Sequence, residues 1–127
     1  MLYNEKGFHE SEPAQFDGKF EWDWMQGCFP RPSIMPADVD ALVEVKGKFL
    51  IFETKKHKGV EIPKGQQYTL RSLFNTGLFT IVVMYGKSVV EDFTFYYPDG
   101  RQVKGNGVEE ARAAIKEWSH YAEPSFS

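Results

Sequence analysis

Apolar residues recur along the chain in patterns that predict five strands. Residues 39–46 and 49–55 are two β-type runs that meet at a tight Lys-Gly-Lys turn, as in a hairpin. Residues 79–85 are continuously apolar, which is typical of a strand buried on both faces. Residues 89–97 and 101–104 flank a Pro-Asp-Gly turn and predict a second hairpin.

Apolar residues at helical spacing predict two helices, and for a third segment they do not decide between helix and strand. In residues 65–76, Gln66, Leu70, Leu73 and Phe74 recur at i, i+4, i+7 and i+8, and Gly77 is a typical stop. Residues 107–121 carry one apolar stripe and predict the last helix. The aromatic residues near 18–26 fit a short helix, but their alternation fits a strand equally well.

This mixture of strands and helices predicts an α/β fold in one domain, residues 1–127. One domain is usual for this length, and 42% hydrophobic residues suffice for a core. We expect residues 1–15 and 123–127 to be poorly ordered. No apolar run is long enough to cross a membrane, no signal-peptide pattern is visible, and the single cysteine, Cys28, fits a reducing cytoplasm.

Charge is distributed unevenly along the chain. The net charge is −3, which argues against a protein that simply coats nucleic acid. Residues 46–71 nevertheless hold seven basic and two acidic side chains, which gives +5 for that segment. A site that meets phosphate requires such a segment, although a lysine-rich solvated loop is the alternative interpretation.

The first predicted hairpin would gather charged residues at its open end. If residues 46–47 form the turn, Asp40 lies opposite Glu53 and Asp38 opposite Lys55. Glu53 and Lys55 also share one face of their strand, by its period of two. A turn that differs by one residue would instead oppose Asp40 to Lys55, so the register is a hypothesis.

Carboxylates gathered in this way favour a metal site. Unpaired buried charge is costly unless it is matched or holds a metal, and Mg²⁺ prefers hard oxygen ligands. Asp40 and Glu53 would supply the carboxylates, with the Thr54 carbonyl as a backbone ligand. The ion would lower the pKa of a bound water and neutralise charge on a scissile phosphate. The alternative interpretation is that these residues are solvated charges at a strand end.

Two kinds of residue would assist this chemistry. Lys55 would steer or help to deprotonate the attacking water and stabilise the developing negative charge. Gln66 or Gln67, in the first turn of the following helix, would orient the water or a phosphate, and the helix N-terminus itself favours an anion. Both glutamines could equally be ordinary helix residues.

The order of these residues resembles the PD-(D/E)XK nuclease superfamily, particularly its small phage-type and resolvase-like members. Glu53 follows Asp40 by thirteen positions and begins the Glu-x-Lys tripeptide that ends at Lys55. Asp40 matches the motif aspartate of the family, and Gln66 or Gln67 matches the helix glutamine of many members. The resemblance implies a Mg²⁺- or Mn²⁺-dependent nuclease, endo or exo, that hydrolyses DNA phosphodiester bonds.

The resemblance also implies a restriction-endonuclease-like fold. The family core is a helix, a β-meander, a helix and a strand, onto which residues 18–86 can be laid, followed here by a C-terminal hairpin and helix. Many members carry an acidic residue on the first helix. Glu21 is the candidate here, with Asp17 and Asp23 as rivals, and Asp38 is either an accessory metal ligand or a surface residue.

DNA is the expected partner. Lys56, Lys58, Lys64 and Arg71 are the candidate phosphate contacts, and the hairpin at 89–104 is a candidate homodimer interface. The alternative function is a catalytically inactive module of the same fold that binds nucleic acid or a protein. A plain interaction domain with an acidic surface is a third hypothesis.

Overall fold

The computed structural model describes residues 21–125 and divides the chain into two compact units, Met1–Pro36 and Ala37–Ser127. The described part of the first unit contains one turn of 3₁₀ helix, η2 (Asp23–Met25). The helix expected near residues 18–26 is therefore reduced to this turn in the part that is described, and the predicted single domain stays a prediction.

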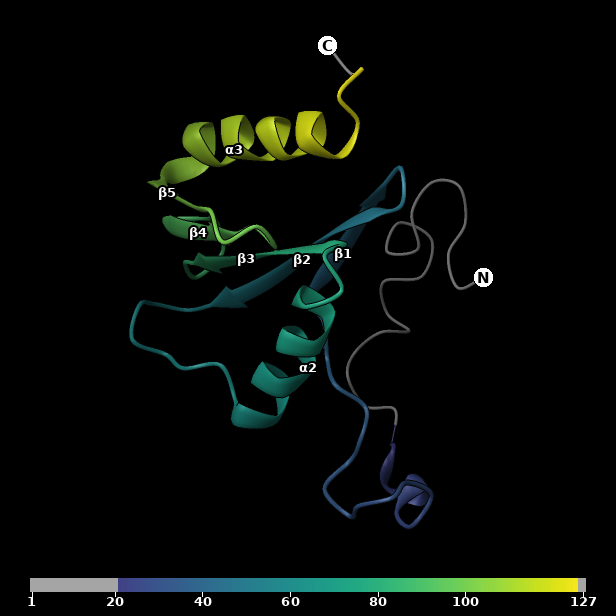
Figure 1. The fold of residues 1–127 in the computed structure, drawn as a ribbon. Helices are drawn as coiled ribbons and strands as arrows, with labels where there is room; N and C mark the ends of the chain where they lie inside the picture. The colour runs from purple at the N-terminus through teal and green to yellow at the C-terminus, as the bar shows by residue number, and fades with distance from the viewer. Residues whose placement is uncertain (1–20, 126–127) are drawn as a thin grey trace, which may run out of the picture. The chain divides into compact units, whose positions relative to one another are not determined.

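The second unit is a five-stranded mixed sheet with two helices (Figure 1). The strands lie in the sheet in the order of the sequence. The strands and helices are β1 (Ala41–Val45), β2 (Lys48–Lys55), α2 (Lys64–Phe74), β3 (Phe79–Tyr85), β4 (Asp92–Tyr96), β5 (Gln102–Asn106) and α3 (Gly107–Ala122). The predicted α/β class is confirmed. Neither helix is long and apolar enough to cross a membrane, a statement that covers the described residues only.

Strand directions follow from the connections. β1 and β2 are antiparallel, as are β3 with β4 and β4 with β5. β2 and β3 are parallel, because α2 carries the chain back across one face of the sheet. Among residues 21–63, only β1 and β2 precede α2, so this stretch holds a hairpin and not the expected β-meander. The prolines of this stretch have no backbone N–H to donate to a ladder, which is consistent with a hairpin rather than a meander there.

The predicted register of the first hairpin is confirmed. β1 pairs with β2 from Ala41 opposite Phe52 to Val45 opposite Lys48, so the two turn residues are Lys46 and Gly47. Both have positive φ, 53° and 81°, as a type I′ turn requires. This turn continues the right-handed twist of the strands, which stabilises the register.

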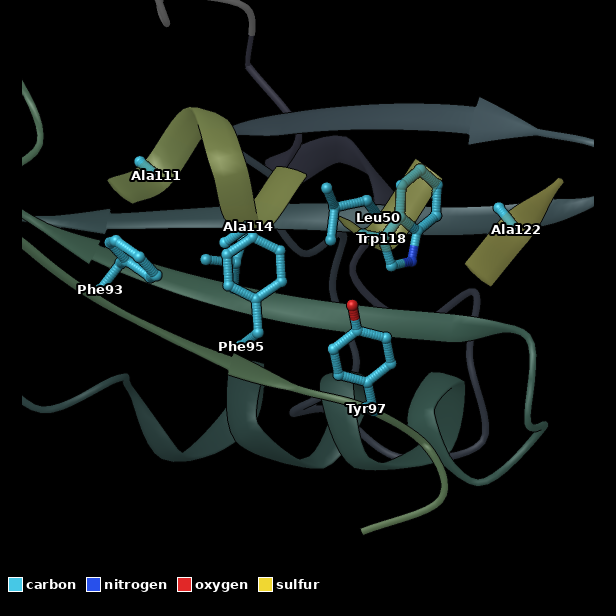
Figure 2. Packing of buried hydrophobic residues seen from close by; sticks show 9 residues of the cluster. Leu50, Phe93, Phe95, Tyr97, Ala111, Ala114, Trp118 and Ala122 are labelled. Carbon is cyan, nitrogen blue, oxygen red and sulfur yellow. The ribbon is translucent and has the colours of Figure 1, made fainter. Parts of the chain in front are cut away.

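Each face of the sheet is covered by a different helix. Phe95 and Leu50 belong to a buried cluster that Ala114 and Trp118 of α3 complete (Figure 2). On the opposite face Ile51 and Ile81 pack, with others, against Leu70 of α2. The alternation along β2 therefore places Ile51, Glu53 and Lys55 on the α2 face.

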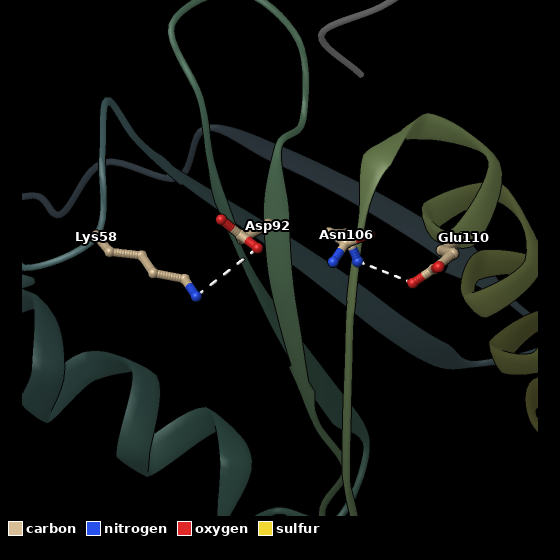
Figure 3. Close-up of polar contacts among 4 residues, drawn as sticks. All are labelled: Lys58, Asp92, Asn106 and Glu110. Carbon is tan, nitrogen blue, oxygen red and sulfur yellow. Dashed lines mark hydrogen bonds and ion pairs between the residues drawn. The ribbon is translucent and has the colours of Figure 1, made fainter.

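The C-terminal hairpin and helix agree with the sequence pattern. β4 and β5 are antiparallel partners, and α3 follows β5 directly. The backbone N–H of Asn106 donates to Glu110 Oε1 at 2.9 Å, which caps the start of α3 (Figure 3). Gly105 allows this approach, because a Cβ there would lie 2.8 Å from Glu110 Oε1 and 2.6 Å from Phe93 Cζ.

We predict that Gly47→Ala destabilises the protein by about 1 kcal/mol, since a Cβ is disfavoured at positive φ. No atom lies within 4 Å of that Cβ, so the cost comes from the backbone alone. Gly65→Ala in α2 is the matched control, because its Cβ also meets nothing within 4 Å and its φ is helical. There we expect a gain of roughly 0.5 kcal/mol. Urea denaturation measures both variants, and equal effects would contradict the assigned turn.

Candidate metal centre

The open end of the β1–β2 hairpin is held together by Asp40. Its Oδ2 accepts hydrogen bonds from the backbone N–H of Thr54 at 2.8 Å and from Thr54 Oγ1 at 3.1 Å. Strand pairing ends one residue later, at Ala41 and Phe52. The carboxylate of Asp40 thus accepts a hydrogen bond from the Thr54 N–H, which the β1–β2 ladder does not pair. This charge-assisted bond fixes the carboxylate of Asp40 against β2.

Glu53 is the buried acid of this site. Its side chain is 1% exposed, and its Oε1 has no hydrogen-bond partner in the part of the chain that is described. Burial raises the pKa of the Glu53 carboxyl, and the negative charge of Asp40 raises it further. The ammonium of Lys55 and a hydrogen bond from the Gln66 side chain lower that pKa, while Asp38 raises it. The net direction is upward.

These donors fit a divalent cation. A buried carboxylate oxygen without a partner is costly, and a positive ion beside it would offset that cost. Asp40 brings a second carboxylate, itself exposed, to the same end of the hairpin. Hard oxygen donors of this kind suit Mg²⁺ or Mn²⁺.

The Thr54 carbonyl can serve as a third donor. The N–H and C=O of a strand residue point to the same side, and the N–H of Thr54 points toward Asp40. Pairing with β1 has already ended at Phe52, so the Thr54 carbonyl lies beyond that ladder. It therefore faces the side on which Asp40 lies.

The two glutamines of α2 have different surroundings. Gln66 Nε2 donates to the Asp38 carbonyl at 2.9 Å, and the same side chain reaches Glu53. Gln67 Nε2 donates to the Ile62 carbonyl at 2.6 Å instead. Successive helix residues point about 100° apart, so only one of the two can face the site. Gln66 therefore lies at the candidate site and Gln67 is held at Ile62, and a catalytic role for either stays a prediction.

The sequence also offers Asp38 and Glu21 as metal ligands. Asp38 presents its main-chain carbonyl to Gln66, and its side chain is exposed. Glu21 and Asp23 lie in the first unit, so a role for either stays a prediction, and Asp17 lies outside the described residues. Within residues 21–125, no group of three or more His, Cys, Asp or Glu side chains lies close enough together to share a metal ion. The second unit thus offers two carboxylates and one carbonyl to the candidate centre.

The predicted phosphate-binding residues lie in the loop between β2 and α2 and on α2 itself. Lys58 Nζ lies 3.7 Å from Asp92 Oδ1, with 70% of the lysine side chain exposed (Figure 3). Such an exposed pair is weak, so the ammonium remains available to an anion. Lys56 and Lys64 are exposed, and Arg71 lines a groove beside α2.

Sequence patterns missed the tyrosines next to this site. Tyr85 is the register partner of Lys55 across the parallel β2–β3 pair, and Tyr96 lies on β4. Both belong to the wall of a groove of about 690 Å³ beside α2. The signal that would have identified them is the parallel register, which the sequence does not encode locally.

Comparison of the chain with protein-family models, with curated proteins and with solved structures finds no match. The interpretation of the site therefore rests on its geometry and on the order of its residues.

We predict that Glu53→Gln stabilises the metal-free protein more at neutral pH than at acidic pH. Below the ordinary value of 4.5 both the folded and the unfolded wild type are protonated, so the Glu53 charge imposes no penalty. As pH rises from there through the raised folded-state pKa, the penalty develops in wild type only. Urea denaturation in EDTA from about pH 4 to about pH 8 measures this. A pH-independent difference between the two proteins would contradict it.

Proposed function

We propose that the chain is a metal-dependent nuclease that hydrolyses DNA phosphodiester bonds with Mg²⁺ or Mn²⁺. The observation that carries the proposal is Glu53, a buried carboxylate with an unpartnered oxygen, beside Asp40 and Lys55. A binding surface has no need of two carboxylates beside phosphate. Asp40, Glu53 and the Thr54 carbonyl would hold the ion.

We further propose that Ala37–Ser127 is a restriction-endonuclease-like fold. The helix α2 and the parallel strand β3 follow in the order that the resemblance implies, with the hairpin of β1 and β2 in the place of the meander. β4, β5 and α3 then extend this core on its far side. The proposal assigns Asp40 and Glu53 to the motif positions of that fold.

Each residue has a distinct part in the proposed reaction. When bound, a divalent cation supplies a water of lowered pKa and neutralises charge on the scissile phosphate. Lys55 stabilises the negative charge that develops on the phosphate as water attacks and the P–O bond breaks. Gln66 is held by the Asp38 carbonyl and orients the attacking water or the phosphate. Thr54 keeps the carboxylate of Asp40 in place.

A second candidate is a nucleic-acid-binding module of the same fold without catalysis. The observation that favours it is the small number of acids, because residues 21–125 offer two carboxylates here and no cluster of three. One Asp40 oxygen is also engaged by Thr54. Metal-dependent cleavage separates the two candidates.

We predict that Glu53→Gln, Asp40→Asn and Lys55→Met each lower Mg²⁺- or Mn²⁺-dependent DNA cleavage by at least about 100-fold. The asparagine retains an acceptor for Thr54, so the variant tests the charge of Asp40 with little structural loss. Cleavage of supercoiled plasmid and of labelled oligonucleotides is the measurement. Glu117→Gln and Lys116→Met on α3 are matched controls, since α3 packs on the opposite face of the sheet.

Cleavage retained in all three site variants would refute the assigned site. DNA binding without cleavage at any concentration of either ion would favour the binding module.

We predict that Lys56→Ala and Lys58→Ala each flatten the salt dependence of DNA affinity. Each lost phosphate contact reduces the slope of log K against log salt by about 0.9 for duplex and about 0.7 for single-stranded DNA. Fluorescence anisotropy in EDTA over a salt series measures the slope. Lys116→Ala on α3 is the control, and the same slope in all variants would contradict the proposed contacts.

A further inference from the structure

The α2 face of the sheet is only partly covered. α2 packs on Ile51, Ile81 and Val83, while α3 packs on the other face. By strand alternation, Thr94 of β4 and Lys104 of β5 also point to the α2 side, and both line a hollow at the surface. We call the residues Tyr85, Thr94, Tyr96 and Lys104 on this face the platform.

The platform is hollowed on both sides of its tyrosines. One hollow, of about 690 Å³, lies between α2 and the sheet and is lined by Arg71 among others. The other, of about 500 Å³, lies over β4 and β5 and is lined by Lys58 and Lys104. Tyr85 and Tyr96 belong to both hollows, and each is half-buried, so part of each tyrosine remains accessible.

The platform continues directly from the candidate metal centre. Lys55 pairs with Tyr85 and Glu53 with Val83 in the parallel β2–β3 register. All four side chains lie on the α2 face. A nucleic-acid strand with one phosphate at the metal centre would therefore pass over Tyr85 with its neighbouring nucleotides.

The charge around the platform favours an anionic ligand. Lys58, Lys104 and Arg71 line the two hollows together with two acids, Asp92 and Glu61. Lys55 at the end of β2 adds a positive charge, while Asp40 and Glu53 beside it are the carboxylates proposed to hold the cation. A chain of net charge −3 thus carries a local excess of basic groups around two tyrosines.

We propose that the platform binds an unpaired segment of DNA, with bases stacked on Tyr85 and Tyr96 and phosphates at Lys58, Lys104 and Arg71. This inference rests on the proposed nuclease function and names the form of its substrate. It makes the DNA next to the cleaved bond single-stranded, as in a flap, a gap or an open end.

Stacking is the reason for an unpaired segment. An aromatic ring on an open sheet face presents its π-face only to bases that are not stacked in a duplex. Tyr96 pairs with Ile81, so Tyr85 lies four residues further along β3, about 13 Å at roughly 3.3 Å per residue. The two rings can therefore contact different nucleotides of one strand.

Binding of oligothymidine of about twelve nucleotides tests the proposal, with a duplex of equal length as comparison. Fluorescence anisotropy measures the affinity, and EDTA in the buffer prevents cleavage. We expect the single strand to bind more tightly, and Tyr85→Leu and Tyr96→Leu each to weaken it roughly tenfold. Tyr85→Phe and Tyr96→Phe should bind as wild type, because phenylalanine retains the ring. Leucine keeps an apolar contact with the α2-side core, and thermal melting verifies folding.

Equal affinity of the leucine and phenylalanine variants, or preference for the duplex, would overturn the platform. These outcomes are independent of the nuclease proposal. If cleavage is metal-dependent but the leucine variants bind the single strand as tightly as wild type, the platform is refuted and the nuclease proposal is not. Tyrosine-dependent single-strand binding without cleavage under any metal refutes the nuclease alone.

Discussion

The two-residue turn at Lys46 and Gly47 sets the pairing of β1 with β2, and the site depends on that pairing. Because side chains alternate along a strand, a slip of one residue would move Glu53 to the α3 face. Asp40 would then lose its bonds to Thr54. The apolar neighbours of Glu53 reinforce the register, since Ile51 must point toward α2 for the core on that side to form.

The same pairing places an acidic residue, Glu53, in a buried apolar position, which is unfavourable for a charged side chain. Ile51, Ile81 and Val83 form the apolar core on the α2 face, and Glu53, which shares that face, is at least as buried as they are. A raised pKa is the expected consequence, and it means that the folded protein tolerates the charge of Glu53 poorly without a cation. Proteins keep such destabilising groups mainly at functional sites, which is the physical argument for chemistry here.

Local signals predicted much of this arrangement. The hairpin register followed from the turn residues, and the last helix followed from its apolar stripe, because both depend on residues close in sequence. The choice between Gln66 and Gln67 did not follow, since it depends on how α2 is rotated against the sheet. Tyr85 and Tyr96 were missed because the parallel β2–β3 register is set by a crossover and not by a turn. The meander was expected from the resemblance, and the described residues before α2 hold only two strands.

The structure of crystals grown with Mn²⁺ tests most directly the central claim, that this site binds a divalent cation. The account predicts an anomalous peak bound by the carboxylates of Asp40 and Glu53 and by the Thr54 carbonyl. The otherwise unpartnered Oε1 of Glu53 should point at the ion. A peak at another place, or no contact between Glu53 and the ion at saturating Mn²⁺, would contradict the account.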